Sequence, residues 1–106
     1  MDISEYFPAA QDVRTELQGY LGLYVRTLSV AENMEAEKTI TQHGELDYTI
    51  WLIHTLVVDE EGSPVFASCE IIRNMAFQAF NRLAGSFGVA MNRISEVVNG
   101  DTPAAS

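Results

Sequence analysis

The sequence Leu56-Val57-Val58-Asp59-Glu60-Glu61-Gly62-Ser63-Pro64-Val65-Phe66 joins two apolar segments through a short acidic stretch. Gly62 can adopt a positive φ, and Pro64 can neither continue a helix nor donate a hydrogen bond to a sheet. The three carboxylates favour contact with water, so we predict a solvated turn over residues 59–64. The stretch carries no side chains arranged for catalysis. We therefore expect the function to come from surfaces that the protein shows to other proteins.

The segment before this turn, residues 45–58, is apolar on nearly every side from Ile50 to Ile53. We predict a helix at the centre of the core, because Glu45 and Asp47 suit a helix N-terminus and the segment is longer than most strands. Its branched side chains keep a strand as the alternative.

The segment after the turn contains a long amphipathic pattern. At 100° per residue, its apolar side chains fall within an arc of about 100°, which predicts one helix of about six turns over residues 76–98. These side chains are Ala76, Phe80, Leu83, Ala84, Phe87, Met91, Ile94 and Val98. Gly85 and Gly88 each cost this helix about 1 kcal/mol relative to alanine, so we expect a bend or the close approach of another backbone there. A shorter helix over residues 70–75 is predicted to be capped by Ser68.

Residues 12–27 have the pattern of a β-hairpin with a turn at residues 18–20. Leu21, Leu23 and Val25 alternate with other residues, so we predict that they share one buried face.

A mostly polar helix is predicted to follow the hairpin. Ser29 and Glu32 have the spacing of a capping box, and Gly44 is a typical stop, so the helix should cover residues 30–42. Its thin apolar edge consists of Val30, Met34 and Ile40 or Thr41.

These elements predict an α+β fold that is mostly α, with an N-terminal β-hairpin followed by about four helices. We predict a single domain over residues 1–106. It should comprise a flexible arm at residues 1–11, a globular core at residues 12–98 and a flexible tail at residues 99–106. The only apolar cluster of the arm is Tyr6-Phe7-Pro8.

The charge of the chain argues against several classes of partner. Fifteen acidic residues stand against six basic ones, giving a formal charge of −9. Such a chain repels phosphate backbones and anionic membrane surfaces, so we expect no nucleic acid and no membrane partner. A single cysteine, Cys69, fits a reducing compartment, and the first residues lack the pattern of a signal peptide. We expect a cytoplasmic protein.

No group of reactive residues predicts an enzyme or a cofactor site. His43, His54 and Cys69 are separated by 11 and 15 residues, which matches no compact zinc motif. We expect His54 to be a core histidine bonded to the backbone. The sequence Gly85-Ser86-Phe87-Gly88 lacks the lysine and the preceding strand of a phosphate-binding loop. We therefore predict no catalytic residue, no metal and no cofactor.

The order of three motifs is informative. Leu23-Tyr24-Val25-Arg26-Thr27-Leu28-Ser29-Val30-Ala31-Glu32 is an apolar strand followed by Arg-x-Leu-Ser-x-x-Glu. Val57 to Phe66 runs from an apolar segment through Asp-Glu-x-Gly to an apolar-Phe pair, and Phe80-Asn81-Arg82-Leu83-Ala84 opens the long helix. In this order, over residues 21–99, the motifs resemble the tail assembly chaperones of long-tailed phages and prophages. Ala67-Ser68-Cys69-Glu70 departs from the more acidic helix start of that family.

The resemblance implies a small, largely helical protein that is not an enzyme. Members self-associate and coat the tape-measure protein, keeping it soluble and extended until the tail tube polymerises. They act in the host cytoplasm and are not part of the mature virion. The expected partners are therefore the tape-measure protein and further copies of this chain.

Contact with such a client requires adaptable apolar side chains. Our candidates for the interaction surface are Met75, Phe77, Phe87, Val89 and Met91. For Phe77, Phe87 and Met91 a place in the core is the alternative, whereas Val89 lies among polar residues on the helical wheel.

The alternative function is a small acidic inhibitor or adaptor of the DNA-mimic type, which would bind a basic site on another protein. Such a protein should space its carboxylates over one rigid face. The carboxylates of this chain are instead scattered over several predicted elements.

Overall fold

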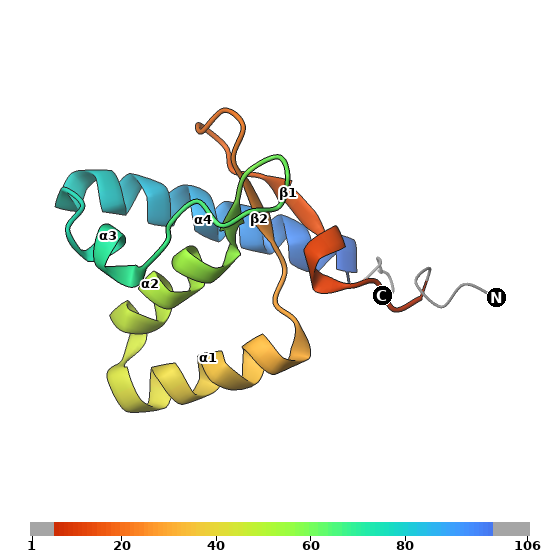
Figure 1. The fold of residues 1–106 in the computed structure, drawn as a ribbon, viewed down its shortest axis with the longest axis horizontal. Helices are drawn as coiled ribbons and strands as arrows, with labels where there is room; N and C mark the ends of the chain where they lie inside the picture. Colours follow the sequence, from red (N-terminus) through yellow and green to blue (C-terminus); the bar gives the residue numbers. More distant parts are fainter. Residues whose placement is uncertain (1–5, 99–106) are drawn as a thin grey trace.

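A computed structural model describes residues 6–98 of the chain. Its sheet has three antiparallel strands in the order β1-β2-β3 (Figure 1). β1 (Arg14–Glu16) pairs with β2 (Tyr24–Arg26), and β2 pairs with β3 (Val57–Val58). The predicted N-terminal hairpin is confirmed, and β3 extends it to a sheet.

The loop of the hairpin is longer than the sequence predicts. The backbone N–H of Leu17 donates to the carbonyl of Leu23 at 2.9 Å, and Gly19 and Gly22 between them have positive φ angles. Leu21 lies in this loop and is fully exposed. The prediction that Leu21 faces the core was wrong, because the alternation of a strand does not extend into the loop.

α1 (Val30–His43) begins with the predicted capping box. Ser29 Oγ accepts from the backbone N–H of Glu32 at 3.1 Å, and the Glu32 carboxylate accepts from the backbone N–H of Ser29 at 3.0 Å. Gly44 ends the helix with a φ of 91°. Both predicted ends of this helix are confirmed to within one residue.

The apolar edge of α1 points away from the core. Val30 and Met34 are exposed, whereas the buried residue of this helix is Ala36. α1 packs mainly on α2 (Glu45–Leu56). The sequence predicted the extent of α1 but not which side of the helix faces its neighbour.

α2 confirms the helix predicted for most of residues 45–58. Only the last two predicted residues, Val57 and Val58, form a strand, β3, which was the alternative prediction for this segment. The helix buries Ile50, Leu52, Ile53 and Leu56. It therefore occupies the central place in the core that its apolar composition predicts.

The acidic turn that follows β3 is held by its own first residue. Asp59 Oδ1 accepts from the backbone N–H groups of Glu61 and Ser63 at 2.9 and 3.0 Å. Gly62 has a φ of 87°, the positive angle for which glycine is suited. The predicted turn over residues 59–64 is confirmed.

Two helices complete the fold. α3 (Cys69–Arg73) is shorter than predicted, and Ser68 occupies its N-cap position without a side-chain hydrogen bond. α4 (Phe77–Val98) confirms the long amphipathic helix. A Cβ atom placed on Gly85 or Gly88 would meet nothing in the described chain within 4 Å, so the expected close approach of another backbone does not occur within this chain.

The core lies between the sheet, α2, α3 and α4 (Figure 1). Burying one large apolar side chain of this kind stabilises a fold by about 1.5–3 kcal/mol. Its buried members include Leu17, Val25, Ile53, Leu56, Val57, Ile72, Leu83, Phe87, Ala90 and Ile94. The fold class is α+β and mostly α, as predicted.

The ends of the chain were predicted to be flexible. The tail at residues 99–106 and the first five residues of the arm lie outside the described residues. The last two residues of the arm begin a 3-10 turn, η2 (Ala10–Asp12), that the sequence did not predict. Within residues 6–98, no helix has both the length and the apolar character needed to cross a bilayer.

Candidate functional site

A shallow groove lies where the first turns of α2, the helix α3 and the first turn of α4 meet. Its volume is about 330 Å³. Ile50 and Ile72 are buried and form its floor. The walls are Leu46, Met75, Phe77 and Phe80, and the charged side chains Asp47 and Arg73 complete the lining. We call this set of eight residues the apolar groove.

Two local features of the sequence build the groove. Leu46 and Ile50 are four residues apart on α2, so they lie on one face of that helix. α3 ends as the backbone N–H of Met75 donates to the carbonyl of Ile72 at 3.1 Å. The short link to α4 then places Met75 and Phe77 beside the α2 face.

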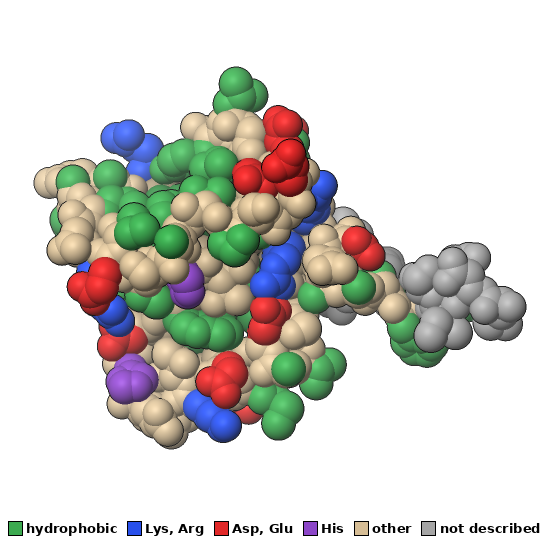
Figure 2. Space-filling model, in the orientation of Figure 1, with side chains coloured by type: hydrophobic (Ala, Val, Ile, Leu, Met, Phe, Trp, Pro, Cys, Tyr) green, Lys and Arg blue, Asp and Glu red, His purple; other side chains and the backbone are tan. Residues whose placement is uncertain are grey.

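The walls of the groove are left uncovered in the monomer. Phe77 is 69% exposed and Leu46 is 63% exposed, although both are large and apolar. Figure 2 shows apolar side chains gathered over α3 and the adjoining part of α4. Large apolar side chains that are exposed beside a hollow with a buried apolar floor are typical of binding grooves.

The charged rim of the groove centres on Arg73. Its Nη1 donates to Glu70 Oε1 at 2.8 Å, and its Nη2 lies 3.5 Å from Asp47 Oδ1. The hydrogen bond to Glu70 and, after it, the charge of Asp47 raise the pKa of Arg73 above its ordinary value. These groups are solvent-exposed, so the pairs orient the rim and add little to stability.

The structure brings only two of the five candidate residues together. Met75 and Phe77 are neighbours in the apolar groove. Phe87 is 4% exposed and belongs to the core, which removes it from the interaction surface of the folded monomer. Met91 is half-buried and packs against the same core. Val89 is exposed, but it lies about 18 Å along α4 from Phe77 at 1.5 Å per residue.

Sequence reasoning missed most of the lining. It assigned Ile50 to the core and gave no role at a surface to Leu46, Ile72 or Phe80. One signal was available, because Leu46 precedes Ile50 by four residues and so extends the apolar face of α2 into its polar first turn. The approach of α3 and α4 to that face depends on tertiary packing and had no such signal.

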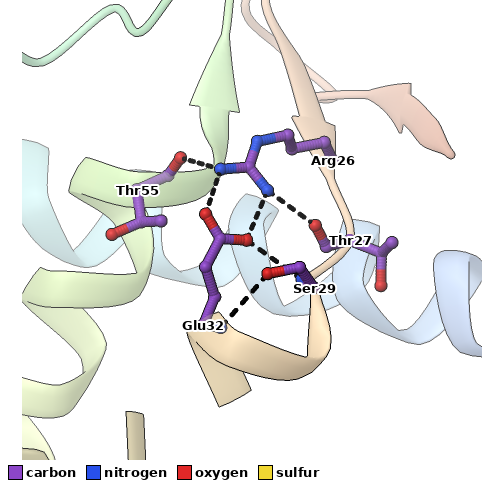
Figure 3. A network of polar contacts seen from close by, with 5 residues as sticks. All are labelled: Arg26, Thr27, Ser29, Glu32 and Thr55. Atoms are coloured by element: carbon purple, nitrogen blue, oxygen red, sulfur yellow. Dashed lines mark hydrogen bonds and ion pairs between the residues drawn. The ribbon is translucent and has the colours of Figure 1, made fainter. Parts of the chain in front are cut away.

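A second cluster of polar side chains surrounds Arg26 at the end of β2 (Figure 3). Its two Nη atoms donate to the two carboxylate oxygens of Glu32 at 2.8 and 2.6 Å. They also donate to the carbonyls of Thr27 at 2.9 Å and Thr55 at 3.3 Å. The guanidinium group therefore joins β2 to the start of α1 and to the last turn of α2.

This Arg26 cluster holds elements together, and its groups are occupied by one another. The hydrogen bond from Arg26 is the main reason why the pKa of Glu32 falls from 4.5 to about 2. The same bond raises the pKa of Arg26 above its ordinary value. We assign the cluster a structural role. It gives a physical basis to the Arg-x-Leu-Ser-x-x-Glu motif, in which the sequence had explained only the serine and the glutamate.

The two histidines and the cysteine belong to different helices. His54 Nδ1 donates to the carbonyl of Phe66 at 2.7 Å, which confirms the predicted bond to the backbone, although His54 is half-buried rather than in the core. His43 ends α1, and Cys69 begins α3 as a half-buried free thiol. Within the described residues 6–98, no three His, Cys, Asp or Glu side chains lie close enough together to hold a metal ion.

Comparisons with protein-family models, with curated proteins and with solved structures found no match to this chain. Its function is therefore inferred from its own residues, and the apolar groove is our candidate surface for a partner.

Proposed function

We propose that this protein is a phage tail assembly chaperone, a binding protein and not an enzyme. Its apolar groove would hold part of the tape-measure protein and keep that client soluble and extended until the tail tube polymerises. The observation that carries this proposal is the exposure of Leu46 and Phe77 around a preformed apolar floor. The proposal places the protein in the host cytoplasm during assembly and outside the mature virion.

The groove suits one apolar face of a helix. An amphipathic helix presents side chains at positions i, i+3, i+4 and i+7, and a groove between helices accepts two or three of them. At about 330 Å³, the groove has room for only a few side chains. Each contact is accordingly weak, which a chaperone needs if it must release its client.

The side chains of the walls suit client segments that differ in sequence. Met75 has an unbranched, polarizable side chain that can adopt several shapes at little cost. Phe77 and Phe80 provide large apolar area with few rotatable bonds. Such a surface binds apolar segments in general rather than one defined sequence.

Coexpression with a tape-measure protein tests the proposal. We expect the client to be soluble and to copurify with the wild-type protein, and to be insoluble with Phe77→Asp. The variant should fold, because Phe77 is exposed at the first residue of α4, where an acidic side chain suits the helix dipole. Val30→Asp is the matched control, since Val30 is an exposed apolar residue at the first position of α1. A client that stays insoluble with the wild type, or that Phe77→Asp keeps soluble equally well, would contradict the proposal.

A further inference from the structure

The segment that precedes β1 exposes two aromatic side chains. Tyr6 and Phe7 are 66% and 73% exposed, and their ring centroids are 6.4 Å apart. They are as uncovered as Phe77 and Leu46, although aromatic rings of this size gain most from burial. We call residues 6–9 the aromatic arm.

The aromatic arm and the apolar groove lie at opposite ends of the molecule. In Figure 1 the arm, in red, lies to the right of the sheet, and α3 lies near the left end of the longest axis. η2 and β1 hold the chain from Ala10 onward, so residues 6–9 are only four residue steps long before the first fixed point. Fully extended, those residues span about 14 Å. The arm is thus held on the side of the molecule away from α3, and we expect Tyr6 and Phe7 to contact a second copy rather than the groove of their own chain.

We propose that Tyr6 and Phe7 of one copy dock in the apolar groove of a second copy, and that a client helix must displace them to bind. The groove offers Leu46, Met75 and Phe77 as apolar walls of the size that two aromatic rings can fill. The contact itself needs no client. Only the displacement step rests on the proposed function of the groove.

The separation of the two surfaces determines the form of the assembly. Each copy offers one arm and one groove, so the contact is head-to-tail and leaves a free arm at one end and a free groove at the other. Further copies can then add at these free ends, and the contact extends to an open chain unless the rotation between successive copies closes it. Two aromatic side chains bury roughly 150–250 Å² each, less in total than the roughly 800 Å² per partner of a standard interface, so the chain should grow and dissociate with protein concentration.

Two variants test the contact by complementation. Tyr6→Ala/Phe7→Ala removes the arm and keeps the groove, whereas Phe77→Asp disables the groove and keeps the arm. By sedimentation velocity, we expect the wild type to form a concentration-dependent series and each variant alone to associate about tenfold more weakly or not at all. An equal mixture of the two variants should form a one-to-one complex and no larger species. Leu21→Asp, which alters another exposed apolar residue, is the control and should associate like the wild type.

Three outcomes would overturn the contact between copies. They are a wild type that stays monomeric at high concentration, an arm variant that associates like the wild type, and a variant mixture that forms no complex. Circular dichroism and thermal melting of each variant show that a loss of association does not come from unfolding.

A synthetic peptide of residues 6–12 tests the displacement step. We expect this peptide to dissociate the wild-type series and to compete with a labelled helical segment of the tape-measure protein, and a peptide with both aromatic residues replaced by alanine to do neither. Dissociation of the series without competition would overturn displacement. If the arm-dependent series forms but the client segment does not bind at all, the proposed function fails and the contact between copies stands.

Discussion

Arg26 shows how one side chain can position three elements of a small protein. Its guanidinium group bonds Glu32 in α1 and the Thr55 carbonyl near the end of α2 while its own backbone belongs to β2. A cation at the last carbonyls of a helix also complements the helix dipole. The sequence predicted the capping box of Ser29 and Glu32 because that pattern is local. It could not reveal the bond to Thr55, because 29 residues separate that carbonyl from Arg26.

Replacing Glu32 with glutamine should make the stability of the protein less dependent on acid. The pKa of Glu32 is about 2 in the folded protein against an ordinary 4.5, so its contribution is complete above pH 4.5 and is lost as the pH falls toward 2. We expect Glu32→Gln to lower the free energy of unfolding at pH 7 by about 1–2 kcal/mol, allowing for solvent screening. Urea unfolding at several pH values should show this difference shrinking between pH 4.5 and 2. Glu96→Gln is the control at an exposed position of α4, and an equal loss there would contradict the assignment.

Replacing Arg26 with lysine keeps the charge but removes the planar pair of donors. A lysine cannot bond both Glu32 oxygens and the two carbonyls at once. We expect Arg26→Lys to lower the free energy of unfolding by about 1–2 kcal/mol, as measured by urea titration. An unchanged midpoint would show that charge alone accounts for the Arg26 cluster.

At the scale of elements, strongly periodic segments were predictable and those defined by their neighbours were not. α4 was predicted because its apolar arc repeats over six turns, and the acidic turn because Gly62 and Pro64 restrict the backbone. β3 is only two residues long and continues directly from α2, so no pattern of its own marks it. The apolar groove was also not predictable, because its walls come from three helices and no repeat in the sequence shows how these helices pack together.

The glycines of α4 provide a prediction about this element. A Cβ atom at Gly85 or Gly88 meets no atom of the described chain within 4 Å, and alanine favours a helix by up to about 1 kcal/mol over glycine. We expect Gly85→Ala and Gly88→Ala each to raise the free energy of unfolding by about 0.5–1 kcal/mol. The midpoint of urea unfolding measures this gain. A loss of stability in the isolated monomer would mean that the backbone of α4 is strained where the structure shows an ordinary helix.

At the scale of the whole molecule, a charge of −9 opposes any contact between copies. Salt screens this repulsion and leaves apolar contacts in place. Self-association of the wild type should therefore strengthen as salt rises from about 50 to 500 mM, at which the Debye length is well below 10 Å. Light scattering at fixed protein concentration measures this. Dissociation at high salt would indicate that ion pairs, not the aromatic arm, join the copies.

The salt dependence of the affinity for a partner also distinguishes the two functions that the sequence left open. An acidic inhibitor binds a basic site through charge, so its affinity falls as salt rises. A chaperone that uses the apolar groove holds its client by apolar contact, and its affinity persists.

The most direct measurement is the affinity of a labelled helical segment of the tape-measure protein for this protein, determined by fluorescence anisotropy at about 50 and 500 mM salt. We predict binding that is maintained or strengthened at high salt, is lost in Phe77→Asp and is unchanged in Val30→Asp. Binding that collapses at high salt and is indifferent to Phe77→Asp would contradict a function based on the apolar groove.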